Sequence, residues 1–272
     1  MPIIEAIVLG IVQGLTEFLP ISSTGHLRIV PAFLGWEDPG SAFTAVTQLG
    51  TMAAVLLYFR DDLWRIARSF VRSLKAGETR DQDARLGWYI VLGTVPIGFF
   101  GLIFKDQIES GARDLYVIGT ALIVLGLVLL VAEKVGTRER DMDRITPRDG
   151  LVVGLAQAMA LVPGVSRSGA TITAGLFLGL DRAAAARFSF LLSVPAVVLS
   201  GLFEMRKFVG EGGDDTGAGA LIVATFFAFV VGYASIAFLL RFLANHSTYV
   251  FVGYRVVLGA TVLVLVAAGV IS

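Results

Sequence analysis

The 272-residue sequence contains no cysteine and carries little charge for its length. The missing cysteines exclude disulfides, thiolate metal sites and a cysteine nucleophile. Charged residues make up 16% and hydrophobic residues 56%, whereas a typical soluble domain has about 25% and roughly 45–50%. Equal numbers of basic and acidic residues, 22 of each, leave no basic excess that would favour nucleic acid as a partner. With a mean hydropathy of +0.78, the composition predicts a polytopic membrane protein and excludes a disordered chain or a soluble enzyme.

Six apolar runs are long enough to cross a bilayer, which takes about 20 helical residues. They are Ser41–Phe59, Leu86–Phe104, Leu115–Ala132, Phe188–Phe203, Ala218–Leu240 and Val250–Ile271. Two further apolar stretches, 3–34 and 151–180, are interrupted near their middle by Pro, Gly and hydroxyl residues. Irregular backbone at membrane depth is tolerated only where protein or water covers it. We interpret these two stretches as re-entrant helical hairpins, with an ordinary seventh span over Ile3–Leu19 as the alternative.

Lys and Arg residues are concentrated in two of the segments between these runs. Residues 60–85 carry seven and residues 133–150 carry five, whereas 105–114 and 206–217 carry two each. The positive-inside rule therefore predicts a multi-pass protein of the cell membrane with the two basic segments inside. The amino terminus and the first hairpin are then outside. Within 60–85, apolar and basic residues segregate to different helical faces, which predicts an amphipathic helix on the inner surface.

The two interrupted stretches align without a gap at an offset of 144 residues. The matched pairs include Gly10 with Gly154, Gln13 with Gln157, Ser22 with Ser166, Thr24 with Ser168, and Gly25 with Gly169. Each half, about residues 1–132 and 145–272, is then one hairpin followed by three spans, and this odd number of crossings inverts one half relative to the other. The predicted fold is a single all-α membrane domain over residues 1–272. It has six transmembrane helices plus two re-entrant helical hairpins in an inverted-topology repeat, an arrangement typical of transporters.

The interruptions at residues 20–26 and 163–169 are the tips of the two predicted hairpins. Both tips combine hydroxyl side chains with glycine and lead into a helix. Backbone N–H groups, hydroxyls and a helix N-terminus together favour anion binding, although capping of the helices is the structural alternative. The second tip adds Arg167, whose guanidinium suits bidentate contact with phosphate. Because a charge at membrane depth is costly, we expect it to be functional. The predicted substrate-binding residues are Gln13, Ser22, Thr24, Gly164, Ser166, Ser168 and Thr171.

Glu17 and His26 flank the hydroxyl cluster of the first tip. They could act as general base and acid, or Glu17 could help hold a hard divalent cation. In the repeat alignment Glu17 faces Leu161, Ser23 faces Arg167 and His26 faces Ala170, so the halves share a scaffold but differ in their reactive groups. This division favours chemistry over symmetrical transport.

Two long motifs make the sequence resemble the undecaprenyl-diphosphate phosphatase family, the integral membrane enzymes linked to bacitracin resistance. Residues 13–26, QGLTEFLPISSTGH, match the family's Glu/Gln-x-x-x-Glu motif and the following hydroxyls, and residues 163–171, PGVSRSGAT, match its PGxSRSxxT motif. Gln13 stands where many members have Glu. The regions 48–50 and 188–195 are also similar to the family.

The resemblance implies hydrolysis of undecaprenyl diphosphate to undecaprenyl phosphate and phosphate, which recycles the lipid carrier for cell-wall synthesis. It implies a polyprenyl diphosphate substrate among membrane lipids, a divalent cation such as Mg²⁺ or Ca²⁺, an active site open to the outer face, and a homodimer.

The hypothesis for the mechanism makes Glu17, Ser23, His26 and Arg167 the catalytic residues. Ser23 attacks the terminal phosphorus, and His26 takes its proton. Glu17 orients His26 or binds the cation, and Arg167 holds the phosphates. Direct attack by water, with Ser23 only a ligand, is the open alternative for the chemistry. A secondary transporter or lipid flippase on the same repeat is the alternative function.

Overall fold

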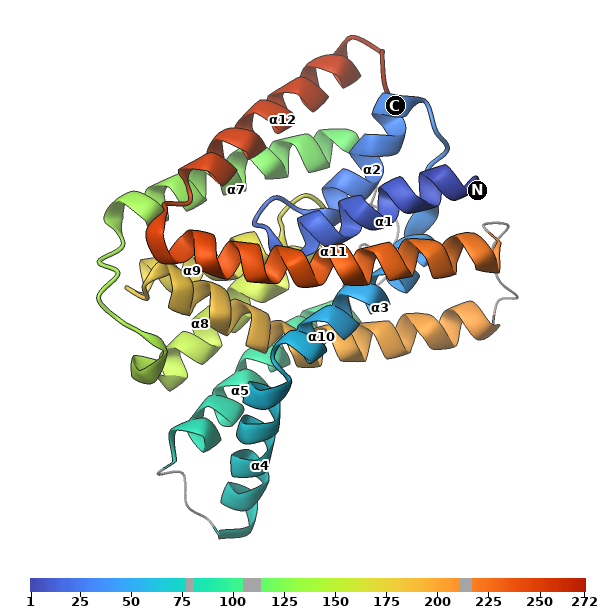
Figure 1. Cartoon of the computed structure of the whole chain (residues 1–272). Helices are drawn as coiled ribbons and strands as arrows, with labels where there is room; N and C mark the ends of the chain where they lie inside the picture. Colours follow the sequence, from blue (N-terminus) through green and yellow to red (C-terminus); the bar gives the residue numbers. More distant parts are fainter. Residues whose placement is uncertain (77–80, 105–113, 211–216) are drawn as a thin grey trace.

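The computed structural model describes residues 1–76, 81–104, 114–210 and 217–272, and the side chains within them except those of residues 41, 76 and 200–210. Parts of three predicted loops, at 77–80, 105–113 and 211–216, lie outside the described residues. Every regular element in the described part is a helix (Figure 1). The helices are α1 (Ile3–Phe18), α2 (Ser23–Leu34), α3 (Gly40–Tyr58), α4 (Arg60–Ala76), α5 (Gln82–Ile103), α7 (Leu115–Val135), η1 (Met142–Arg144), α8 (Pro147–Ala158), η2 (Met159–Leu161), α9 (Arg167–Phe177), α10 (Arg182–Gly210), α11 (Ala218–Asn245) and α12 (Tyr249–Ala267).

Five of the described helices are long and apolar enough to cross a membrane, and they overlap five of the six predicted runs. They are α5, α7, α11, α12 and the Arg182–Leu199 part of α10. The remaining predicted run is in α3, whose residues Ala42–Tyr58 pass the same test only together with Arg60–Lys75 of α4, at a bend of 75°. The prediction of an all-helical, multi-pass membrane protein is therefore confirmed, with five or six candidate spans.

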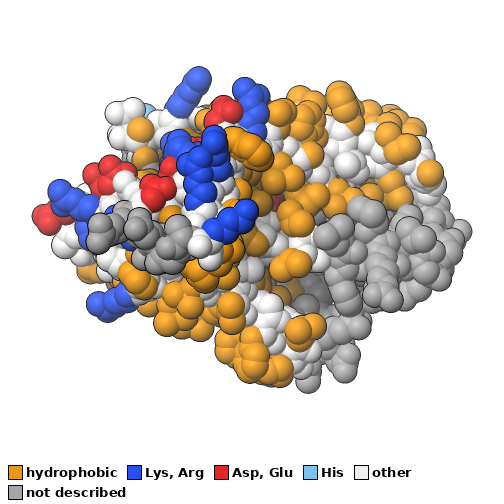
Figure 2. Space-filling view, turned by 90° about the horizontal axis from the view of Figure 1, so that it is seen from below, with side chains coloured by type: hydrophobic (Ala, Val, Ile, Leu, Met, Phe, Trp, Pro, Cys, Tyr) orange, Lys and Arg blue, Asp and Glu red, His pale blue; other side chains and the backbone are white. Residues whose placement is uncertain are grey.

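Helix α4 diverges from the rest of the bundle together with α5 (Figure 1). Its sequence alternates acidic and basic residues with exposed apolar ones, of which Trp64 is 72% exposed. An exposed tryptophan on a basic amphipathic helix is typical of a helix lying in the membrane interface. Seen from below, Lys, Arg, Asp and Glu side chains gather at one end of the molecule, while hydrophobic side chains cover much of the remainder (Figure 2).

The two interrupted stretches form helix–break–helix pairs, α1 with α2 and α8 with α9. Helix α1 packs on α11, and α8 packs on α5. Both contacts depend on aligned glycines, because a Cβ on Gly10 would lie 2.3 Å from the Ala224 oxygen and one on Gly154 would lie 2.4 Å from the Gly93 backbone. Small residues allow such close backbone approach between membrane helices. The breaks lie where the sequence predicts them, while re-entry into the membrane and the inverted relation of the halves stay predictions.

The largest cluster of buried side chains surrounds α9 and α10. Ile172, Leu176, Phe188 and Leu192 are each fully buried within it. Van der Waals packing of this kind, rather than transfer from water, stabilises helix contacts inside a membrane. The cluster fixes α9, and therefore the position of the second tip, against α10.

Candidate active site

The two tips have the same backbone conformation at the residue that caps the following helix. Ser22 and Ser166 cap α2 and α9, and both have positive φ, 77° and 72° respectively. Each cap hydroxyl accepts the backbone N–H three residues on, from Gly25 at 3.3 Å and from Gly169 at 3.1 Å. A serine at positive φ is strained, and such strain is concentrated at functional sites. The caps direct the first turns of α2 and α9 into the space between the tips.

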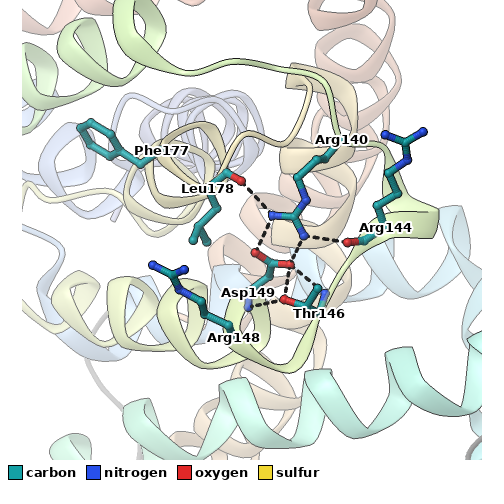
Figure 3. Close-up of a pocket in the computed structure, with 7 residues that line it drawn as sticks. All are labelled: Arg140, Arg144, Thr146, Arg148, Asp149, Phe177 and Leu178. Carbon is teal, nitrogen blue, oxygen red and sulfur yellow. Dashed lines mark hydrogen bonds and ion pairs between the residues drawn. The ribbon is translucent and has the colours of Figure 1, made fainter.

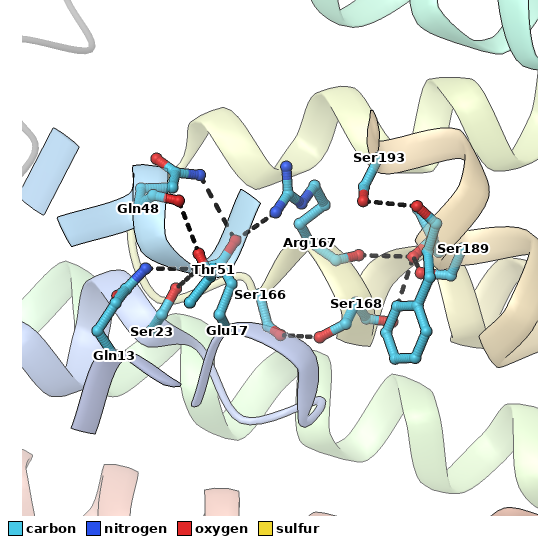
Figure 4. Close-up of polar contacts among 12 residues, drawn as sticks. Gln13, Glu17, Ser23, Gln48, Thr51, Ser166, Arg167, Ser168, Ser189 and Ser193 are labelled. Carbon is cyan, nitrogen blue, oxygen red and sulfur yellow. Dashed lines mark hydrogen bonds and ion pairs between the residues drawn. The ribbon is translucent and has the colours of Figure 1, made fainter. Parts of the chain in front are cut away.

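Glu17 accepts hydrogen bonds from four side chains at the end of α1 (Figure 4). Its Oε2 accepts the Ser23 hydroxyl at 2.6 Å and Gln13 Nε2 at 3.2 Å. Its Oε1 accepts from Arg167, in an ion pair, and from Gln48 Nε2 at 3.5 Å. Glu17 is 8% exposed as a residue, and the charge of its carboxylate is balanced by the Arg167 guanidinium. The structure thus brings together Glu17, Ser23 and Arg167, which the sequence predicts as catalytic.

His26 does not contact Ser23. Its Nδ1 lies 2.7 Å from the Ser22 carbonyl oxygen, which can only accept, so Nδ1 carries a proton. Nε2 lies 2.7 Å from the hydroxyl of Tyr254 on α12. The expected proton transfer from Ser23 to His26 therefore differs from the observed geometry, in which the Ser23 hydroxyl points to Glu17. The difference arises because His26 is one helical turn beyond Ser22 and folds back onto its carbonyl.

The remaining predicted hydroxyls hold the second tip in place. Ser168 Oγ donates to the Leu19 carbonyl at 3.0 Å, which joins the second tip to the first. Thr171 Oγ1 lies 2.7 Å from the Arg167 carbonyl and 2.5 Å from Ser189 Oγ. Both hydroxyls are buried. They position the backbone that carries Arg167.

Thr24 and Gly164, both predicted to bind substrate, differ in their exposure to solvent. Thr24 is exposed at the mouth of the first tip, and its hydroxyl lies 3.3 Å from that of Ser22. Gly164 has φ 84°, and a Cβ there would lie 2.7 Å from the Ile118 oxygen, so only glycine fits. Thr24 is therefore accessible from solvent, whereas Gly164 allows close packing of the second tip.

Arg255 on α12 is a residue for which the sequence analysis assigns no role. It is fully buried, and its guanidinium donates to five backbone carbonyls, those of Pro20, Ala121, Leu122, Gly164 and Val165, at 3.0–3.3 Å. Pro20 belongs to the first tip and Gly164 to the second. One buried side chain therefore ties both tips to α7. An arginine inside an apolar run is the signal that could have found it.

Glu17 and Gln13 carry side-chain oxygen atoms of the kind that a hard cation prefers. No group of three or more His, Cys, Asp or Glu side chains able to hold a metal occurs in the described part of the chain. Gln13 Oε1, however, is buried beside Glu17 without a hydrogen-bond partner. A carboxylate and an amide oxygen are ligands for Mg²⁺ or Ca²⁺, and Mg²⁺ commonly takes its other ligands from water and substrate phosphates.

Comparisons with known proteins cover almost the whole chain. A family model described as "Bacitracin resistance protein BacA" matches residues 6–261. A Mycolicibacterium smegmatis protein named "Undecaprenyl-diphosphatase" is 57% identical over 99% of this chain and 98% of its own length. Proteins of the same name from a Nocardioides species and from Nocardia farcinica are 56% and 49% identical, each over 99% of this chain and at least 97% of their own length.

Proposed function

This chain belongs to the family of the bacitracin resistance protein BacA, and we infer that it is an undecaprenyl-diphosphatase of the membrane. It hydrolyses undecaprenyl diphosphate to undecaprenyl phosphate and phosphate, which returns the lipid carrier to cell-wall synthesis. The observation in the structure that carries this activity is the joint contact of Ser23 and Arg167 with Glu17. The transporter or flippase alternative is not favoured, because the two tips differ in their reactive groups.

The terminal phosphate is proposed to bind between the tips. Arg167 donates to the phosphate oxygens, and in doing so exchanges its contact with Glu17 for one with substrate. The positive ends of α2 and α9 face the same space and favour the negative charge. The exposed hydroxyl of Thr24 supplies a further donor at the mouth. Positioning and charge balance are the main requirements of phosphoryl transfer.

Ser23 is the proposed nucleophile. Its Oγ attacks the terminal phosphorus, its proton passes to Glu17 Oε2 at 2.6 Å, and the bond from phosphorus to the bridging oxygen breaks. Undecaprenyl phosphate leaves with that oxygen. Water then attacks the phosphoserine, so that phosphate is released and the hydroxyl restored. His26 holds the Ser22 carbonyl and acts as a positioning residue in this scheme.

A divalent cation, Mg²⁺ or Ca²⁺, is proposed to be held by Glu17 and Gln13 Oε1 together with substrate oxygens. When bound it offsets phosphate charge.

Phosphate release from undecaprenyl diphosphate in detergent, measured with and without a chelator, tests the proposed function. We expect turnover that Mg²⁺ or Ca²⁺ restores after chelation. Ser23→Ala should nearly abolish single-turnover release while the lipid still binds. If the variant kept more than about a tenth of the rate, a loss of less than ~1.4 kcal/mol, the nucleophile would be water and not Ser23. Absence of phosphate release by the wild type under all metal conditions would overturn the enzyme assignment.

We further propose that α1–α2 and α8–α9 are re-entrant hairpins of an inverted repeat. The site then opens to the outer face of the cytoplasmic membrane, and the protein pairs as a homodimer. The positive-inside rule supports this orientation. Because the chain has no cysteine, Glu37→Cys and Glu139→Cys can be labelled individually in cells. Glu37 should react from outside and Glu139 from inside. Labelling of both from one side would contradict the orientation.

A further inference from the structure

A polar cavity lies at the end of α9 remote from Arg167 and the active site. Its volume is about 480 Å³. It is lined by Arg140, Arg144, Thr146, Arg148, Asp149, Phe177 and Leu178 (Figure 3). Arg167 and Phe177 are the first and last residues of α9, so about 15 Å of helix separates the cavity from the catalytic guanidinium. The cavity is therefore a separate feature that the phosphatase reaction does not use.

A buried ion pair forms the rigid wall of the cavity. Arg140 donates to both carboxylate oxygens of Asp149, at 3.0 and 2.5 Å, and to the carbonyls of Leu178 and Arg144 at 2.8 and 2.6 Å. Burial alone would raise the pKa of Asp149, but hydrogen bonds from Arg140 and Thr146 outweigh it and hold that pKa below its usual value. The two charges cancel. Through its contacts with Asp149 and Leu178, Arg140 joins the segment before α8 to α8 itself and to the end of α9.

Two other arginines at the cavity are exposed and lack acidic partners. Arg148 makes no hydrogen bond or ion pair with the described residues, and Arg144 has only a 3.4 Å contact with the Glu139 carbonyl from its guanidinium. Since Arg140 and Asp149 neutralise each other, the lining has a net charge of about +2. A cavity with a preorganised wall and two uncommitted guanidinium groups suits a phosphate-bearing ligand.

An apolar side chain lies at the same mouth. Phe177 is 47% exposed, and it lies on the same side of Leu178 as the Arg148 side chain (Figure 3). A free phosphate has no apolar atoms that could contact an exposed aromatic ring, whereas a lipid carries acyl chains beside its phosphate headgroup. The predicted basic segment 133–150 contains most of the lining, which places the cavity at the inner surface, where anionic lipids attract arginine.

We propose that this cavity binds the phosphate headgroup of an anionic phospholipid, with Arg148 contacting the phosphate and Phe177 contacting an acyl chain. Arg144, which extends on the other side of the Arg140–Asp149 pair (Figure 3), adds positive charge to the cavity. The bound lipid connects the segment before α8 to the end of α9. The proposal does not depend on the phosphatase mechanism, because none of these residues belongs to the active site.

Lipid binding to the purified full-length protein tests the proposal. The probes are short-chain phosphatidylglycerol, phosphatidylcholine of the same chain length, and glycerol phosphate. The wild type should bind phosphatidylglycerol more tightly than phosphatidylcholine by roughly tenfold or more, and a paired Arg144→Gln, Arg148→Gln variant should lose most of that preference. Phe177→Ser should weaken binding of phosphatidylglycerol but leave any binding of glycerol phosphate unchanged.

The matched control removes the same charge from α4, as Arg68→Gln with Arg72→Gln. Both residues are exposed and basic, and this pair should keep the phosphatidylglycerol preference within about twofold, since only contacts at the cavity are proposed to matter. An equal loss in the control would reduce the effect to general surface charge and overturn the site. Glycerol phosphate binding as tightly as the lipid would assign the cavity to a soluble phosphate. If the paired Arg144→Gln, Arg148→Gln variant bound phosphatidylglycerol as the wild type does, and also unfolded at the same temperature, the proposal would be refuted.

Discussion

At the first tip Ser22 caps α2 and at the second Ser166 caps α9, with almost the same φ and the same hydrogen bond to a glycine three residues later. The reactive groups differ. The first tip is flanked by a carboxylate and an imidazole, and the second carries a guanidinium. Each tip alone offers only part of what phosphoryl transfer needs.

The ion pair between Glu17 and Arg167 joins the unlike groups across the two tips. Buried ion pairs rarely stabilise a fold, because desolvation offsets their attraction. A pair that also contacts the Ser23 hydroxyl is better explained by function. Under the proposed mechanism, the common backbone provides the binding space, and the differences between the tips provide the chemistry.

Arg167 offers the largest test of this comparison. Arg167→Ala should lower kcat/KM by about 10³-fold or more, on the scale of other arginines that stabilise phosphoryl transfer. Arg167→Lys keeps the charge but not the planar fork, so it should restore little of the rate. The measurement is phosphate release at varied lipid concentration. Near wild-type turnover by the lysine variant would show that the second tip supplies only a countercharge.

The second prediction compares substitution of Glu17 with substitution of Gln13, which lies one helical turn earlier on α1. Glu17→Gln should reduce kcat by roughly 10²-fold, within the range that general base catalysis contributes, because the amide cannot take the Ser23 proton. Gln13→Ala is the control, since it also removes a contact to Glu17 but leaves the carboxylate. Turnover and metal dependence should be measured for both. A larger loss for Gln13→Ala would refute the assignment of Glu17.

Arg255 tests whether the two tips depend on one support. Arg255→Met leaves five carbonyls without their donor. Activity should fall by about tenfold or more, on the scale of one to three kcal/mol for an unsatisfied buried group. Reporter cysteines at Thr24 and Val162, one near each tip, should both react faster with a thiol reagent. Faster labelling at one tip only would show that Arg255 supports that tip alone.

Local sequence signals predict much of this site. The Pro, Gly and Ser clusters place both helix breaks, and hydroxyls followed by glycine predict the caps at Ser22 and Ser166. The alignment of Ser23 with Arg167 predicts different reactive groups in the two halves, and the structure places these two side chains on the same carboxylate. These features follow from short segments whose backbone preferences are independent of the rest of the chain.

Long-range partners could not be predicted in the same way. Arg255 meets carbonyls 90 and 235 residues away in the sequence, and Gln48 reaches Glu17 from another helix. The expected link between Ser23 and His26 differs from the observed hydrogen bonds, because the Ser22 carbonyl and Tyr254 of α12 contact the two ring nitrogens. Such contacts depend on helix packing, which periodicity alone does not specify.

The two cap hydroxyls sharpen the comparison at a smaller scale. Ser22→Ala and Ser166→Ala each remove one cap hydrogen bond and should lower stability by about 1 kcal/mol. Since the caps have the same geometry, thermal unfolding in detergent should shift by similar amounts in both variants. A large shift in one and none in the other would show that the tips share a backbone shape but not its energetic role.

Tyr254→Phe should have the smallest effect, and it concerns a contact that the second tip lacks, since Ala170 aligns with His26. The change removes the 2.7 Å hydrogen bond to His26 Nε2 but keeps the ring, which packs parallel to the imidazole with centroids 5.6 Å apart. The net value of such a hydrogen bond is about 0.5–1.5 kcal/mol, so turnover should fall by roughly tenfold at most. Tyr116→Phe, at a side chain that is 52% exposed, is the control. If His26 only positions the Ser22 carbonyl, Tyr254→Phe should leave the pH profile of kcat unchanged. A displaced profile, or a loss as large as that of Arg167→Ala, would show that the imidazole exchanges a proton during the reaction.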